Sequence, residues 1–127
     1  MTIYITSSLK LKDIQRRFSD AFPYLKIEFF SGSMVSTDGV IKHIRADKDL
    51  HILNPASVSV RQIIITPRST ALGVGEFFIR NFGLYVKVFR KSEHSWTDIS
   101  SDNKWVLQKH NWIGREESGA LFDFELL

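Results

Sequence analysis

Two segments of the chain alternate ringed and charged side chains with apolar ones, which suits a binding surface on a β-sheet. Successive side chains of a strand point to opposite faces, so one face of each segment gathers the rings and charges. In the later segment this face carries Tyr85, Lys87, Phe89 and Lys91. In the earlier segment it carries Tyr24, Lys26, Glu28 and Phe30.

Such a face has two chemical uses if helices cover only the opposite side of the sheet. It can bury against a protein partner or a second copy, because aromatic residues and arginine are enriched in interface cores. It can also bind single-stranded nucleic acid, with bases stacked on the rings and phosphates on the lysines. Glu28 and the absence of a glycine–aromatic RNA-binding motif favour the protein partner. The remaining alternative is burial of the rows under a helix or loop.

The sequence lacks a complete catalytic or metal-binding motif. Its four histidines, at positions 43, 51, 94 and 110, are scattered without the helical spacing of metal ligands. There is no G-x-S-x-G turn, although a Ser–His–Asp triad assembled from distant positions stays open. The absence of cysteine excludes thiol nucleophiles, disulfides and cysteine-zinc sites. We therefore expect a protein that is not an enzyme and needs no metal or cofactor, with a small enzyme of unrecognised site as an alternative.

One short glycine-rich stretch, Gly73-Val74-Gly75, matches part of a nucleotide-binding fingerprint. The third glycine position is occupied by Phe78 and no Walker lysine follows, so neither type of pyrophosphate cradle is complete. A phosphate site here would use Arg68 and the backbone around Ser69 and Thr70. The structural alternative is a weakened first turn of a helix.

The length of 127 residues predicts a single domain, 1–127, with internal units of about 1–60 and 61–127. Residues 1–92 contain fourteen Lys and Arg against seven Asp and Glu, and residues 93–127 contain three against seven, so the net +3 separates into +7 and −4. This asymmetry suits a protein partner, self-association or nucleic acid. Without a signal peptide pattern or a membrane-spanning apolar run, we expect a cytoplasmic protein with no membrane partner.

The first thirty residues predict a strand, a helix and a second strand. Residues 3–6 are β-branched and aromatic, and Ser7-Ser8 offers a helix cap. The helix is indicated by apolar side chains spaced three or four apart, at Leu11, Ile14, Phe18 and Phe22. Pro23 ends it, residues 24–30 form the second strand, and residues 31–33 form a turn.

The same order returns about sixty residues later. Residues 61–66 predict a strand, and Ser69 or Thr70 caps a helix that includes Val74, Phe78 and Phe82. Phe18 and Phe22 match Phe78 and Phe82 at an offset of sixty. After one inserted residue, residues 24–27 match residues 85–88 in pattern and in the identities of Tyr and Lys. We interpret this correspondence as an internal duplication.

The remaining elements complete an α+β fold. We expect a short helix at 40–46, a loop at 54–57, and a hairpin at 92–95 that leads into a strand at 96–99. Asp102 would cap a last helix, Gly114 or Gly119 would end it, and residues 121–126 would form a final strand. The prediction is a mixed sheet with helices mainly on one face, built from two related strand–helix–strand units.

Two resemblances follow from these residues. The order of elements from Val86 to Leu126 resembles the later part of a ubiquitin-like β-grasp fold, which implies a β-grasp-like second half. The chain ends in Leu126-Leu127 where conjugated modifiers have Gly-Gly, so conjugation is not implied. The segments 22–30, 88–92 and 103–111, with Trp96, resemble a family of small uncharacterised bacterial proteins, a resemblance that implies no function. Gly73 and Gly75 depart from that family, in which strong helix formers are expected.

Overall fold

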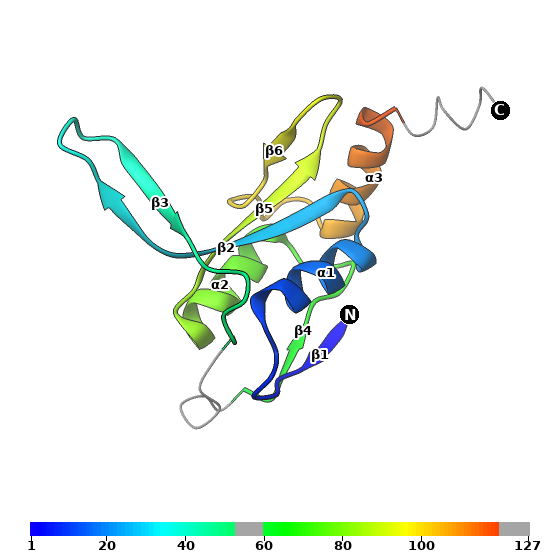
Figure 1. Ribbon diagram of the computed structural model, residues 1–127. Helices are drawn as coiled ribbons and strands as arrows, with labels where there is room; N and C mark the ends of the chain where they lie inside the picture. Colours follow the sequence, from blue (N-terminus) through cyan, green and yellow to red (C-terminus); the bar gives the residue numbers. More distant parts are fainter. Residues whose placement is uncertain (53–59, 120–127) are drawn as a thin grey trace.

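The computed structural model describes residues 1–52 and 60–119, and in this part of the chain three helices pack against two β-sheets (Figure 1). The elements in chain order are β1 (Thr2–Tyr4), α1 (Leu11–Ala21), β2 (Leu25–Val35), β3 (Ile41–Arg45), β4 (Gln62–Ile64), α2 (Ala71–Phe82), β5 (Tyr85–Lys91), β6 (Trp96–Asp98) and α3 (Leu107–Glu117). The α+β class predicted from the sequence is confirmed. None of these helices is long and apolar enough to cross a membrane.

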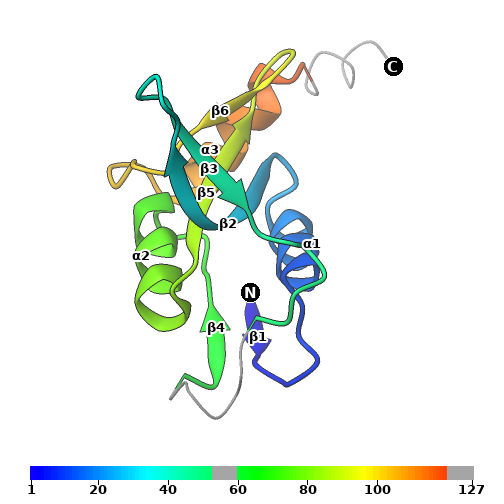
Figure 2. The same ribbon diagram turned by 60° about the vertical axis from the view of Figure 1, so that its left-hand side comes forward.

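The strands form a small sheet, β1-β4, and a larger sheet in the order β3-β2-β5-β6 (Figures 1 and 2). All pairings between the described strands are antiparallel, which makes these sheets more uniform than the single mixed sheet expected from the sequence. Two of the pairings are hairpins, which are antiparallel by construction. The other two, β1 with β4 and β2 with β5, join equivalent strands of the two units.

These two pairings between units reveal an approximate two-fold axis. Ile3 pairs with Ile63, its equivalent at an offset of sixty, and Ile27 pairs with Val88, its equivalent after the one-residue insertion. A two-fold axis perpendicular to a sheet reverses the direction of a strand, so two equivalent strands that pair about such an axis run antiparallel, which explains the uniform pairing. The backbone arrangement therefore supports the interpretation of the sequence as an internal duplication.

The core lies between the larger sheet and the helices. The β2 side chains Leu25, Ile27 and Phe29 are buried on one face of the sheet, together with Val88 of β5. Phe29 packs edge-on against Phe78 of α2, with ring centroids 5.1 Å apart. Figures 1 and 2 show α1 and α2 on the same side of this sheet. The helices are thus placed on one face, as the sequence predicts.

α3 lies on this same side, over the beginning of β2 and the end of β5. The Asn111 side-chain oxygen of α3 accepts a hydrogen bond from the Tyr24 amide, at 2.8 Å. Arg90 of β5, whose position alternates with that of Lys91, points toward the helix and contacts His110. The opposite face of the larger sheet is consequently left without a helix in the described part of the chain.

The segment 40–46, predicted as a short helix, forms strand β3 instead, so this prediction is wrong. The turn predicted at 31–33 is also wrong, because β2 continues to Val35 and the chain reverses at residues 36–40. There the Ser36 amide donates to the Val40 carbonyl oxygen at 2.9 Å, and Gly39 adopts a φ of 83° that other residues rarely accept. The turn chemistry of Asp38-Gly39 therefore outweighs the apparent helical spacing of the residues that follow.

The first helix begins later than predicted. Ser7-Ser8 lies in a turn before the helix, and Lys10 is the N-cap residue of α1. The Lys12 amide, in the first turn of α1, donates to the Lys48 carbonyl oxygen at 3.0 Å. Lys48 lies in the segment that follows the β2–β3 hairpin. This contact supplies a partner that a serine cap would otherwise provide for the helix start. The loop predicted at 54–57 lies outside the described residues.

For α2 the N-cap residue is one that the sequence predicts, whereas for α3 it is not. Thr70 is the N-cap of α2, and its Oγ1 accepts a hydrogen bond from the Gly73 amide at 3.1 Å. Asp102 is not the cap of α3, because Val106 occupies that position and Asp102 accepts from backbone amides of the preceding turn. Gly119, with φ 80°, follows the end of α3. The strand predicted at 121–126 lies outside the described residues.

Two helical glycines give opposite predictions for the same substitution. A Cβ at Gly114 of α3 would lie 2.9 Å from the Tyr24 Cβ and 3.1 Å from the Tyr24 carbonyl oxygen, whereas a Cβ at Gly75 of α2 would meet nothing within 4 Å. We expect Gly114→Ala to destabilise the fold, and Gly75→Ala to stabilise it by about 0.5–1 kcal/mol through helix propensity. Urea unfolding of both variants measures this, and a shift in the same direction for both would contradict it.

Candidate functional site

The uncovered face of the larger sheet carries most of the sequence-predicted binding residues. Cross-strand pairing places Lys26 beside Phe89, Glu28 beside Lys87, and Phe30 beside Tyr85. Side chains from both outer strands extend this row across the sheet. We call the following set the open sheet face: Lys26, Glu28, Phe30, His43, Arg45, Tyr85, Lys87, Phe89, Lys91, Trp96 and Asp98.

One predicted member, Tyr24, lies at the end of this set, where its carbonyl oxygen accepts a hydrogen bond from the Lys91 amide at 2.8 Å. It precedes the first residue of β2, and its backbone amide is held by Asn111 of α3. Its Cβ also lies close to Gly114 in the same helix. Tyr24 therefore joins the larger sheet to α3.

The lysines of the open sheet face lie against its rings. The Lys26 ammonium is 4.6 Å from the Trp96 ring centroid and 5.3 Å from that of Phe89. Lys91 approaches Trp96 from the neighbouring strand, at 5.1 Å. Lys87 lies 5.6 Å from the Phe30 ring centroid. These are cation–π distances, so the strands are linked by alternating rings and ammonium groups.

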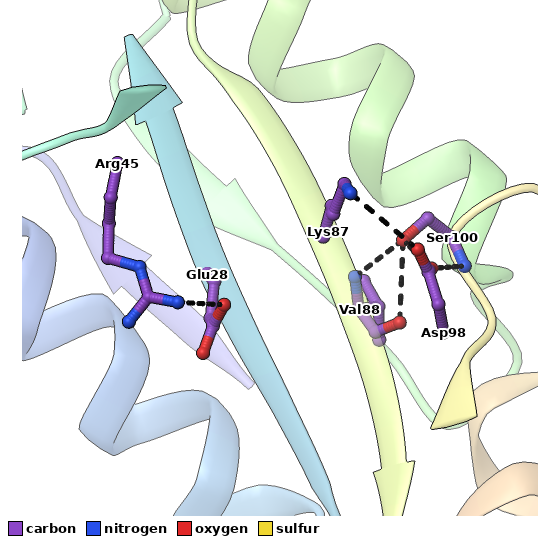
Figure 3. A network of polar contacts seen from close by, with 6 residues as sticks. All are labelled: Glu28, Arg45, Lys87, Val88, Asp98 and Ser100. Carbon is purple, nitrogen blue, oxygen red and sulfur yellow. Dashed lines mark hydrogen bonds and ion pairs between the residues drawn. The ribbon is translucent and has the colours of Figure 1, made fainter. Parts of the chain in front are cut away.

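Two carboxylates pair with cations of the same face (Figure 3). Glu28 lies 3.3 Å from the Lys26 ammonium and 3.1 Å from the Arg45 guanidinium. Asp98 lies 4.0 Å from Lys87. With four Lys and Arg against two carboxylates, the open sheet face has a formal net charge of +2. Part of its positive charge is therefore neutralised within the protein.

The end of β6 is fixed to β5 by a serine below this row (Figure 3). The Val88 amide donates to the Ser100 Oγ at 2.9 Å, and the Ser100 amide donates to the Asp98 carboxylate at 2.9 Å. Because Val88 lies at the two-fold axis, these contacts connect the exposed acid to the centre of the sheet. Asp98 is thus held in position for its pairing with Lys87.

Exposure differs among the members of the face. Phe30 is buried, whereas 56% of Tyr85 and 37% of Trp96 remain exposed, and Arg45 is largely exposed. Trp96 and Arg45 are members of the face that the sequence does not predict. The available signal for Arg45 was the alternation of residues 41, 43 and 45, which the interpretation of 40–46 as a helix concealed.

The proposed phosphate residues Arg68, Ser69 and Thr70 lie at the start of α2, and the amides of the first two already have acceptors. The amides of Arg68 and Ser69 donate to Thr66, through its Oγ1 at 3.2 Å and its carbonyl oxygen at 3.0 Å. The Gly73 amide donates to Thr70. The adjoining cavity of about 260 Å³ is lined by apolar side chains such as those of Val74, Phe77 and Phe78, with few polar groups. This geometry does not favour an anion site.

A second polar cluster lies between β5 and α3. His110 is only 2% exposed, and its Nε2 lies 2.7 Å from the Asp102 carboxylate. Its Nδ1 lies 3.0 Å from Arg90 Nη1, which can only donate. Nδ1 is therefore the acceptor, and Nε2–H donates to Asp102. This hydrogen bond is the main reason that the pKa of Asp102 lies below its ordinary value.

This arrangement argues against a hydrolytic triad at His110. A triad histidine needs one nitrogen on the acid and the other on a nucleophile. Here the second nitrogen is occupied by Arg90, which cannot serve as a nucleophile. The other histidines do not supply a metal centre either, since no group of three or more potential metal ligands gathers within residues 1–52 and 60–119.

The lowered pKa of Asp102 predicts a pH dependence of stability. Its ionised form is stabilised in the folded state, so this contribution is present above the unfolded-state pKa and is lost as the pH falls through the folded-state pKa. We expect the difference in unfolding free energy between the wild type and Asp102→Asn to be largest near neutral pH and to shrink in acid. Urea unfolding across this range tests it, and a constant difference would contradict it.

Comparisons with known proteins identify no relative of this chain. No protein-family model matches the chain, and neither the curated proteins nor the solved structures that were searched yield a match.

Proposed function

We propose that the protein is a non-catalytic binding module that acts through contacts with another protein or with its own copy, and that the open sheet face is the contact surface. The observation that carries this proposal is the exposure of Tyr85, Trp96 and Arg45 on one face, which none of the helices within residues 1–52 and 60–119 covers. Tyrosine, tryptophan and arginine are the residue types that dominate the energetics of protein interfaces.

The internal contacts of the face favour a protein partner over single-stranded nucleic acid. A base that stacked on Trp96 or Phe89 would have to displace the Lys26 ammonium from the ring. Phosphates would also compete with Glu28 and Asp98 for the lysines. A protein surface can cover the rings and cations together and keep these pairs, so its binding requires less rearrangement.

The flanking hairpins enlarge the surface available to a partner. β3 and β6 are the edge strands of the larger sheet, and their residues are exposed. Their open-face side chains, among them Arg45 and Trp96, are therefore accessible from the side as well as from above. This shape supports recognition of an extended protein surface rather than a small ligand.

A matched pair of double variants tests the proposal. Tyr85→Ala/Trp96→Ala removes two exposed rings from the open sheet face, while Tyr4→Ala/Trp112→Ala removes an exposed tyrosine and tryptophan from β1 and α3. We expect only the first variant to lose the partners or the oligomeric state of the wild type. Light scattering and quantitative cross-linking in extracts measure this, with circular dichroism to confirm folding. If the first variant keeps every partner and its assembly state, the proposed surface is wrong.

The nucleic-acid alternative has its own measurement. We expect no binding of a fluorescent single-stranded oligonucleotide at low salt, because the ring faces and lysines are already paired. Fluorescence anisotropy over a salt titration tests this. Binding that weakens steeply with salt and is lost in Lys26→Ala/Lys87→Ala would replace the protein-binding proposal with a nucleic-acid function.

A further inference from the structure

The β2–β3 hairpin extends beyond the helices as an arm (Figures 1 and 2). In the outer part of this hairpin, residues 35–45, which we call the arm, four apolar side chains are exposed, with exposed fractions of 68% for Val35, 50% for Val40, 61% for Ile41 and 43% for Ile44. Every residue of β3 is exposed, so this strand adds nothing to the buried core. Proteins normally protect an edge strand from pairing with other chains, often by charged side chains such as the Lys42 and Arg45 of β3, so a partner strand must keep its own cations away from these two.

The equivalent hairpin of the second unit is shorter. β5 has 7 residues where β2 has 11, and β6 has 3 where β3 has 5. The additional length belongs to the first unit alone, and the fold of the second unit does without it. An exposed apolar arm that the core does not require is best explained by a contact outside this chain.

The hydrogen bonds of the hairpin determine which backbone groups of β3 face outward. Ser36 bonds with Val40, and bonded pairs of an antiparallel ladder recur every second residue. By the register of the two strands, the amides and carbonyls at positions 42 and 44 point toward β2. The amides and carbonyls of Ile41, His43 and Arg45 point away from β2. No strand in the described part of the chain accepts or donates hydrogen bonds at these outward groups.

We propose that these three residues pair with β3 of a second copy, antiparallel, about a two-fold axis at His43. This inference goes beyond the proposed function and identifies the partner at this edge as the chain itself. Ile41 of each copy then lies opposite Arg45 of the other, and His43 lies opposite its own equivalent. All three outward positions find a bonded partner, because they are spaced symmetrically about His43.

The charges of β3 favour this register over its neighbours. In the proposed register, Lys42 lies opposite Ile44 of the second copy and Arg45 lies opposite its Ile41, so aliphatic stems pack on isoleucines and no lysine or arginine faces another. A shift of one bonded step toward the tip places Lys42 opposite Lys42 of the second copy. The opposite shift leaves Ile41 without a partner in β3. Charge and strand length therefore select the same arrangement.

The pairing has a consequence for the proposed binding surface. Residues directly opposite each other in an antiparallel pair lie on the same face of the sheet. Arg45 belongs to the open sheet face, so the open sheet faces of both copies lie on one side of a continuous sheet that contains both larger sheets. A partner protein would then meet two adjoining copies of the surface.

The absence of cysteine from the chain makes a direct test available. His43→Cys should form a disulfide-linked dimer under mild oxidation, because the two introduced thiols lie opposite each other. Val35→Cys, in the same arm but on β2, is the control and should cross-link about tenfold more slowly. Ile41→Cys and Arg45→Cys should cross-link poorly alone and efficiently when mixed, which reports the register.

A second variant separates pairing from folding. The His43 amide points outward, so His43→Pro removes a donor that the hairpin itself does not use. We expect this variant to keep its circular dichroism spectrum and to sediment as a monomer where the wild type sediments as a dimer. A wild type that remains a monomer from micromolar to millimolar concentration would overturn the inference, as would equal cross-linking of the His43→Cys and Val35→Cys variants.

These results are independent of the test of the open sheet face. A monomeric wild type whose partners are lost only in Tyr85→Ala/Trp96→Ala contradicts the β3 pairing and leaves the proposed function in place. A dimer that cross-links through position 43, together with partners that persist in Tyr85→Ala/Trp96→Ala, supports the pairing and contradicts the role of the open sheet face.

Discussion

The antiparallel pairing of β2 with β5 is the contact on which the rest of the molecule depends. It joins the two units at Ile27 and Val88, both buried, and thereby brings the helix of each unit to the same side of one sheet. The edge-on contact between Phe29 and Phe78 crosses from one unit to the other. Neither half contains this core by itself. The open sheet face is equally a joint product, since its rings and charges come from both central strands.

The sequence predicts what depends on local pattern. The helical spacing of Leu11, Ile14 and Phe18 and the alternation of residues 85–91 each identify an element whose buried side the structure confirms. The arm was missed because two residues at its tip, Asp38 and Gly39, decide the direction of the chain, while the following isoleucines have spacing compatible with a helix. Local periodicity cannot choose between these signals without the partner strand.

Contacts across the sheet could not be predicted from the sequence for a different reason. Lys26 reaches the Trp96 ring from a position seventy residues earlier in the chain, and only the combined registers of β2, β5 and β6 bring the two together. The same holds for His110, whose role follows from the two neighbours that its ring nitrogens meet. Residue types indicated that cations and rings would share a face. Their mutual pairing, in which the lysines lie against the rings and the carboxylates of the same face, required the three-dimensional arrangement.

The unequal hairpins of the two units carry an evolutionary consequence. In a symmetric homodimer each substitution occurs twice, so an extended hairpin would appear at both ends of the assembly. A single chain that contains both units does not have that restriction, because each half can vary separately. The long arm on the first unit and the short hairpin on the second are therefore an asymmetry that a symmetric homodimer of separate units could not have.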